Sequence, residues 1–171
     1  MNNQEENTWG EFPRYHQDEG FQKLWRTHSD SVNIALLIRW QPVNQTGSLL
    51  KTDLLYEAVR DELSSWINSQ AKKVFYIDTS LEVHQMAQCH HSHLQTIRTD
   101  VRCLPFSQGS FDGIISNSTL NHFKSLDEIL TSLRELYRML RPGGQMILTL
   151  DHLANPILLY GIGYLSVCSN I

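Results

Sequence analysis

Residues 74–80 read Val-Phe-Tyr-Ile-Asp-Thr-Ser, and this stretch decides the fold. Its first four residues are apolar and either β-branched or aromatic, which predicts a buried strand. Thr79 and Glu82 then have the spacing of a capping box, so a helix should begin there and run to about His90. The stretch therefore predicts a strand that leads directly into a helix, with Asp78 at the junction.

The same alternation of strand and helix extends along the chain. Short apolar runs predict four further strands, at Ser48–Lys51, Gln95–Thr99, Phe111–Ser116 and Met146–Leu150. Apolar residues three or four apart predict three helices. The first spans Phe21–Trp40, and its buried stripe comprises Leu24, Trp25, Val32, Ala35 and Leu36. The second spans Leu55–Ile67, and the third begins at a capping box of Ser125 and Glu128 and ends at Leu140. This order is typical of an α/β fold: a Rossmann-like parallel sheet of about five strands with flanking helices.

The composition favours one domain and a metabolite-sized substrate. The chain has 171 residues, enough for a single hydrophobic core; residues 1–20 form a polar leader, and residues 21–171 form the domain, with its core over 48–151. The net charge of −4, without clustered Lys and Arg, disfavours a general nucleic-acid binder. The polar leader is no secretory signal and the three cysteines are scattered, so we expect a cytoplasmic protein without a membrane span.

Polar residues follow each predicted strand, where ligands of open parallel sheets bind. They are Thr52 and Asp53, Asp78, Asp100 with Val101, Asn117 with Ser118, and Asp151 with His152. The carboxylate after the second strand is suited to a ribose, because its two oxygens match two neighbouring hydroxyl donors. The alternative for Asp78 is an acid that stabilises the start of a helix through the helix dipole.

Two segments resemble class I S-adenosylmethionine-dependent methyltransferases. The first is Asp100-Val101-Arg102-Cys103-Leu104-Pro105-Phe106, continuing through Ser110-Phe111-Asp112. The second begins with Ser118-Thr119-Leu120-Asn121-His122-Phe123 and continues with Arg134 to Gly144, which ends in Arg-Pro-Gly-Gly. The resemblance, strong from about Val74 to Asp151, implies S-adenosyl-L-methionine as cofactor. Together with the composition, it leads us to expect a small-molecule methyl acceptor.

The resemblance also implies roles for individual residues. Asp78 would bind the ribose, and Asp100 would accept a hydrogen bond from the adenine amino group. The backbone of Val101 would bond the edge of the ring, and Asn117 would approach the methionine end. Catalysis in this family is mostly positioning of the acceptor, so few dedicated catalytic side chains are expected.

The first predicted strand departs from the family. The family carries an acidic residue and a glycine-rich loop there, whereas residues 49–58 read Leu-Leu-Lys-Thr-Asp-Leu-Leu-Tyr-Glu-Ala and contain no glycine. This stretch resembles a variant branch with a Leu-Lys-Thr-Asp-Leu motif. Asp53 or Glu57 would then contact the methionine amino group, and Lys51 would neutralise its carboxylate. The alternative is a helix start capped by Thr52 or Asp53 beside an exposed Lys51.

Histidines raise two further candidate sites. His122 follows the fourth strand, near the presumed methyl-transfer centre, where an imidazole suits a general base; the alternative is that it orients the loop. A nitrogen and sulfur cluster with zinc-type ligands comprises His84, Cys89, His90, His91 and His93. No second Cys/His pair stands at finger-like spacing, so we assign no metal ligands and expect a solvated helix end.

The end of the chain is the second departure from the family. A sixth and a seventh strand normally follow the fifth, but residues 157–171 are an apolar tail without clear strand-pairing signals. We therefore expect a truncated product or fragment with an exposed sheet edge, and the edge and the tail would offer surfaces for a homodimer. The rival function is a non-catalytic module that works through partner contacts.

Overall fold

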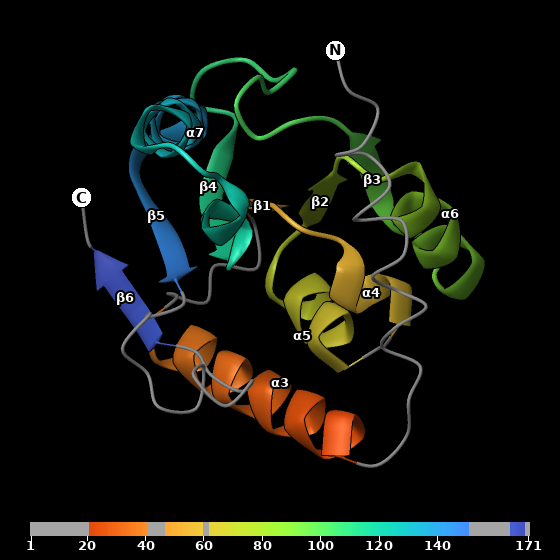
Figure 1. The fold of residues 1–171 in the computed structure, drawn as a ribbon. Helices are drawn as coiled ribbons and strands as arrows, with labels where there is room; N and C mark the ends of the chain where they lie inside the picture. The colour runs from red at the N-terminus through yellow and green to blue at the C-terminus, as the bar shows by residue number, and fades with distance from the viewer. Residues whose placement is uncertain (1–20, 41–46, 60–61, 151–164, 170–171) are drawn as a thin grey trace.

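The computed structural model describes residues 21–40, 47–59, 62–150 and 165–169, which form an α/β fold around one sheet (Figure 1). The predicted leader, the pair Asp151 and His152, and most of the apolar tail lie outside these residues. Within the described ranges, no helix is both long enough and apolar enough to cross a membrane.

Five parallel strands make up most of the sheet, as predicted, and the order of all strands is β3-β2-β1-β4-β5-β6. Their bounds are β1 (Ser48–Lys51), β2 (Lys73–Asp78), β3 (Gln95–Arg98), β4 (Phe111–Asn117), β5 (Leu140–Leu150) and β6 (Leu165–Ser169). Because β1 pairs with both β2 and β4, the strand order reverses there. The carboxyl ends of β1, β2 and β4 consequently share one edge, where such sheets bind ligands.

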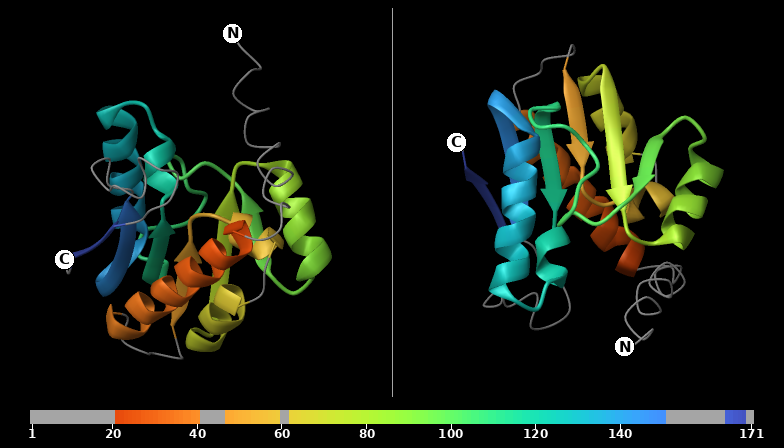
Figure 2. Two further views of the ribbon diagram at one scale, coloured as in Figure 1. Left: turned by 60° about the horizontal axis from the view of Figure 1, so that its bottom comes forward. Right: turned by 90° about the horizontal axis from the view of Figure 1, so that it is seen from above.

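Helices cover both faces of the sheet (Figure 2). One face packs against α3 (Phe21–Trp40), α4 (Leu55–Val59), α5 (Glu62–Gln70) and α6 (Leu81–His90). The other face packs against α7 (Leu126–Met139) and the segment that follows β3. A short 3₁₀ helix, η1 (Thr119–His122), follows β4.

Neighbouring residues of the central strands belong to two different hydrophobic cores. Leu49 and Tyr76 lie in the core on the α3–α6 side, whereas Leu50 and Ile77 lie in the core beneath α7. Because side chains alternate along a strand, a strand covered on both faces must be apolar at nearly every position. This explains the continuous apolar runs, and burial of each such side chain contributes about 1.5–3 kcal/mol.

Of the two predicted capping boxes, the one at α7 is present and the one at α6 is not. The box of Ser125 and Glu128 at the start of α7 is confirmed, since each side chain bonds to the other's backbone N–H. The box predicted at the start of α6 is wrong. Ser80 is the N-cap there, and its hydroxyl accepts from the backbone N–H of Val83 at 3.2 Å. Thr79 therefore lies one residue too early to cap α6.

Other element boundaries also differ from the predictions. The helix predicted over Leu55–Ile67 is divided into α4 and α5, and β5 begins at Leu140, which already pairs with Phe111 before an irregularity in the ladder. On α3, Val32 and Ala35 are exposed, whereas Leu37 is buried. The buried face of α3 is thus rotated from the predicted stripe.

The tail contributes one strand where no strand was predicted. β6 runs antiparallel to β5, with Met146 opposite Ser169 and Leu150 opposite Leu165. Among the described strands, β3 and β6 form the two edges of the sheet. The edge of β5 that faces away from β4 is therefore paired with β6 and is not exposed. The predicted homodimer through an edge or the tail stays a prediction.

Candidate functional site

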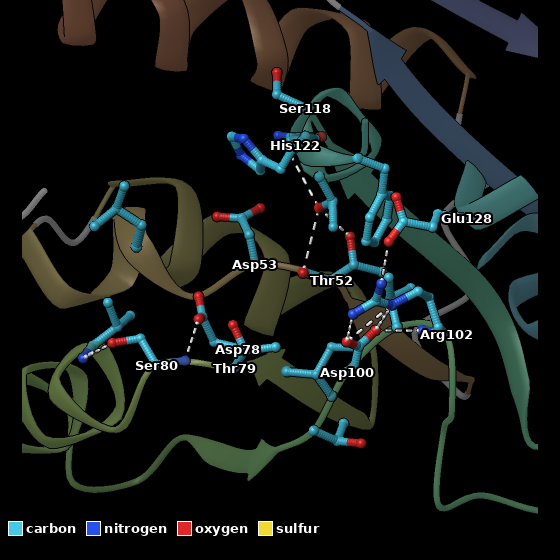
Figure 3. A pocket seen from close by; sticks show the side chains of 18 of the residues that line it. Thr52, Asp53, Asp78, Thr79, Ser80, Asp100, Arg102, Ser118, His122 and Glu128 are labelled. Carbon is cyan, nitrogen blue, oxygen red and sulfur yellow. Dashed lines mark hydrogen bonds and ion pairs between the residues drawn. The ribbon is translucent and has the colours of Figure 1, made fainter. Parts of the chain in front are cut away.

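A pocket of about 560 Å³ opens at the carboxyl ends of β1, β2 and β4 (Figure 3). Eight residues singled out from the sequence line it: Thr52, Asp53, Asp78, Asp100, Val101, Asn117, Ser118 and His122. Lys51 does not line it. The pocket therefore lies at the reversal of strand order, and it gathers side chains that are far apart in the sequence.

Asp78 ends β2 and faces the pocket with a half-buried carboxylate. Its Oδ1 accepts from the backbone N–H of Ser80 at 2.9 Å, and its Oδ2 accepts from that of Leu54 at 3.2 Å. Burial raises the pKa of Asp78, and the two backbone hydrogen bonds offset part of this effect. Since a carboxylate has about four acceptor positions, two remain for a ligand. Its bond to the N-cap of α6 also fits the alternative role at a helix start.

The loop after β1 is anchored to neighbouring strands. The backbone N–H of Thr52 donates to the carbonyl of Ile115 on β4 at 3.0 Å, and that of Leu54 donates to Asp78. The Thr52 hydroxyl also donates to that of Ser116 at 2.9 Å. None of residues 51–55 has a positive φ, so this backbone does not require glycine.

Lys51 lies beneath the loop with a side chain that is 0% exposed. Its Nζ contacts the carbonyl of Asp53 at 2.9 Å, Oδ2 of Asp53 at 2.8 Å and Oε2 of Glu57 at 3.0 Å. These three acceptors match the three donors of an ammonium group. The alternative with an exposed Lys51 is therefore wrong, and all of its donors are already used within the protein.

The two carboxylates around Lys51 differ in their surroundings. Asp53 is 17% exposed and lines the pocket, whereas Glu57 is 0% exposed and its Oε1 has no hydrogen-bond partner. Burial raises the pKa of Glu57 to about 7, with repulsion from Asp53 adding to burial and Lys51 offsetting only part. Burial lowers the pKa of Lys51, but attraction to both carboxylates outweighs burial and raises it. Lys51 thus stays charged, and Glu57 is the carboxyl that takes up a proton.

Asp100 also lines the pocket, paired with Arg102. The guanidinium contacts Oδ2 of Asp100 at 2.6 Å through Nη2 and Oδ1 at 3.0 Å through Nε. Nη1 reaches Oε1 of Glu128 at 2.5 Å, and the guanidinium lies 5.0 Å from the ring centre of Phe123. Burial raises the pKa of Asp100, but the hydrogen bonds from Arg102 outweigh it and lower the pKa. No role was assigned to Arg102 from the sequence, although Arg102 stands two residues after the candidate carboxylate Asp100.

The segment after β4 supplies the remaining wall. Asn117 is buried, and its Nδ2 has no hydrogen-bond partner. Ser118 adopts a left-handed conformation with φ of 51°, which L-residues other than Asn and Asp rarely adopt. Thr119 Oγ1 lies 2.6 Å from Oγ1 of Thr52 and ties this segment to the loop after β1. Exposed His122 lies on this side of the pocket, with Asp53 between it and Asp78 in Figure 3.

The histidines on α6 and in the turn after it make local contacts. Nε2 of His84 lies 3.1 Å from the carbonyl oxygen of Asp78, and the rings of His91 and His93 meet edge to face at 5.9 Å. In the part of the chain that the structure describes, no three His, Cys, Asp or Glu side chains gather closely enough to hold a metal ion.

Comparison with protein families assigns the chain. A model described as a methyltransferase domain matches residues 60–148, slightly more than half of the 171 residues. The chain belongs to the class I S-adenosylmethionine-dependent methyltransferases. The matched part of this methyltransferase domain begins after β1 and after the loop that holds Asp53. The loop without glycine therefore lies outside the match.

Curated relatives of this methyltransferase domain are partial matches. The chain is 35% identical over 60 residues to mouse (Mus musculus) tRNA (carboxymethyluridine(34)-5-O)-methyltransferase ALKBH8, a match that covers 35% of this chain and 9% of that protein. It is 28% identical over 106 residues to arsenite methyltransferase of Aquipseudomonas alcaligenes, covering 62% of this chain and 26% of that protein. The chain thus spans a minor part of the curated relatives it matches.

Solved structures share the fold of this methyltransferase domain. The PH0226 protein of Pyrococcus horikoshii OT3 has a TM-score of 0.67 at 20% identity, covering 92% of this chain and 72% of that chain. The N-methyltransferase NodS of Bradyrhizobium japonicum WM9, solved with S-adenosyl-L-homocysteine, has a TM-score of 0.64 at 15% identity, covering 87% and 71%. At these identities the likeness concerns the fold alone.

The residues of the pocket fit the cofactor that the family uses. Asp78 keeps free acceptor positions for hydroxyl groups, and Asn117 has an unused buried donor. A buried donor without a partner costs about 1–3 kcal/mol, which a ligand acceptor would recover. The volume of about 560 Å³ also lies within the range of small-molecule sites, about 300–1,000 Å³.

Proposed function

We propose that this methyltransferase domain binds S-adenosylmethionine in its pocket and methylates a small-molecule acceptor. The observation that carries the proposal is the gathering of Asp53, Asp78 and Asn117 at the carboxyl ends of three neighbouring strands. Two acidic acceptors and one free amide donor suit a ligand that carries hydroxyl groups, an ammonium and a carboxylate.

Each wall of the pocket has a role in this proposal. Asp78 accepts from the ribose hydroxyls, and Asp100 with the backbone of Val101 faces the adenine. Asp53 accepts from the methionine ammonium, and Nδ2 of Asn117 donates towards the methionine end. When bound, the cofactor supplies an electrophilic methyl group on a sulfonium centre. The protein holds and orients the reactants, which accounts for most of the rate enhancement expected of such a transfer.

The charges around the pocket support a neutral or cationic acceptor. Four carboxylates line it, and two cationic side chains accompany them: Asp53, Asp78, Asp100 and Glu128, with Arg102 and Lys124. This excess of negative charge suits a sulfonium and repels a polyanion. The net charge of −4 points the same way, so we favour a small molecule over tRNA, although the named relatives include methyltransferases of both kinds.

His122 is the proposed general base of the acceptor side. It lies on the wall opposite Ser80, within the lining of the pocket. With an acceptor whose nucleophile carries a proton, His122→Gln should lower kcat about a hundredfold and leave KM nearly unchanged. If His122 only orients the loop, the substitution should change KM and leave kcat nearly unchanged.

Calorimetry tests the proposed function first. We expect S-adenosylhomocysteine to bind the wild-type protein, and radiolabelled methyl transfer from S-adenosylmethionine to proceed to members of a panel of amines, thiols and hydroxy compounds. Bulk tRNA serves as the competing acceptor in the same assay. A folded protein that gives no binding heat at about 1 mM ligand, a concentration that detects even millimolar affinity, would overturn the proposal.

The alternative is a module that acts through partner contacts. α7 exposes Leu126 by 70%, Leu130 by 37% and Tyr137 by 61%, and these residues share one face of the helix. The absence of cofactor binding together with stable self-association in sedimentation would favour this alternative. In either case we propose the cytoplasm as the location, because Cys89 and Cys103 are free, exposed thiols.

A further inference from the structure

Two backbone donors of the loop after β1 are already used within the protein. The N–H groups of Thr52 and Leu54 donate to Ile115 and Asp78 within the protein. The residue between them, Asp53, has a carboxylate that reaches the pocket. The Asp53 side chain is thus the acidic group that this loop presents to a ligand, and a side chain binds tightly only if its position is already fixed.

Lys51 fixes Asp53 at two points. Its Nζ contacts both the main-chain carbonyl and the carboxylate of Asp53, at 2.9 Å and 2.8 Å. Glu57, on α4, holds the same Nζ from the other side at 3.0 Å. The ammonium group is thus clamped between the loop and α4, away from solvent and from the pocket.

We infer that Lys51 is a positioning residue, which holds the Asp53 carboxylate at the pocket wall to receive the methionine ammonium in place of a glycine-rich backbone cradle. This inference rests on the proposed function. It replaces the expectation that Lys51 itself neutralises the cofactor carboxylate. A buried cation that already serves two carboxylates has no donor left for a third.

Two ligands separate this role from a purely structural one. S-adenosylhomocysteine carries the amino acid portion, whereas 5′-methylthioadenosine has the same adenosine and sulfur but no ammonium. Lys51→Met should be combined with Glu57→Gln, so that no buried carboxylate at position 57 is left without its cation. By calorimetry, we expect the double variant to lose about tenfold to a hundredfold in affinity for S-adenosylhomocysteine and less than about twofold for methylthioadenosine.

Asp53→Asn should reproduce this selective loss. Adding Asp53→Asn to the double variant should cost nothing further, because Lys51 acts through Asp53. A matched control removes another ion pair, Arg141→Met with Asp112→Asn; this pair is bridged at 2.8 Å and does not line the pocket. The control should bind both ligands like the wild type.

If the double variant does not unfold cooperatively, Lys51→Arg takes its place. It keeps the charge but moves the donors away from Asp53, and the same selective loss is expected. In a folded variant, equal losses for both ligands, no loss, or additive losses with Asp53→Asn would overturn the role of Lys51. A wild-type protein that binds neither ligand would overturn the proposed function as well.

Discussion

The two walls of the pocket are held in place by different means. The wall around Asp78 lies within the residues that match the family, and backbone N–H groups hold its carboxylate. The wall around Asp53 precedes the match, and the buried charges of Lys51 and Glu57 hold it. Backbone donors are present whatever the side chains, whereas buried charges must balance one another. The first wall should therefore depend mainly on backbone geometry, and the second on three particular side chains.

The largest expected effect is at the wall held by the backbone. Asp78→Ala removes the proposed ribose acceptor and leaves the N–H groups of Leu54 and Ser80 without their partner. We expect calorimetry to show that S-adenosylhomocysteine and methylthioadenosine both lose about 2–3 kcal/mol, because both carry the ribose. Asp78→Asn, which retains one oxygen, should lose less. Unchanged affinity for both ligands in Asp78→Ala would refute the ribose assignment.

The wall held by buried charges should respond to pH. The pKa of Glu57 is about 7 in the folded protein against an ordinary value of 4.5, so the folded state binds more protons between these values. The free energy of unfolding therefore falls as pH rises through this window and levels off above it. The free energy of unfolding of Glu57→Gln lacks this fall. Between about pH 5 and pH 8, it should therefore rise on the order of 2 kcal/mol relative to that of the wild type.

Urea unfolding at several pH values measures this gain. The control is Glu82→Gln, which changes an exposed carboxylate at the start of α6. Its free energy of unfolding should run parallel to that of the wild type. If the free energy of unfolding of Glu57→Gln also ran parallel to that of the wild type, proton uptake by Glu57 would not contribute to stability.

A smaller effect is expected in the segment that follows β4. Ser118 holds a left-handed φ of 51°, which strains an L-residue but not glycine. Ser118→Gly should stabilise the protein by up to about 1 kcal/mol in thermal unfolding, while Ser118→Ala, which keeps the strain, should not. If alanine and glycine had the same effect, the hydroxyl rather than the backbone would be the important feature.

The smallest effect concerns Arg102, which is partly exposed. Because surface ion pairs contribute about 0–1 kcal/mol, Arg102→Met should change stability little. It frees the oxygens of Asp100, so the affinity for methylthioadenosine in the same calorimetric assay should rise about twofold. A marked fall in affinity would instead mean that the guanidinium itself contacts the adenine.

Much of the fold was predictable because its signals are local. The apolar run before Asp78 and the box of Ser125 and Glu128 depend on a few consecutive residues, and both correspond to observed elements. The antiparallel strand β6 was not predictable in this way. Its register pairs Ser169 with Met146, and no local periodicity specifies a partner that far away.

The candidate site was predictable in its members but not in its connections. Asp53, Asp78 and Asn117 each follow a predicted strand, and ligands of parallel sheets bind at the carboxyl ends of the strands. The structure places these three residues in one pocket. The contact of Arg102 with Glu128 joins residues 26 positions apart and exists only after folding. The burial of Lys51 likewise depends on how α4 packs against the sheet, which spacing alone does not reveal.

The cluster of Lys51, Asp53 and Glu57 limits which substitutions can be tolerated during evolution. A cradle made of backbone N–H groups tolerates most substitutions, because almost every amino acid supplies the same group. In this cluster, loss of Lys51 alone leaves the buried Glu57 without its cation, and only a compensating change at Glu57 removes that buried carboxylate. Across descendants of this protein, Lys51 should therefore be lost only together with Glu57, whereas Glu57 can change by itself.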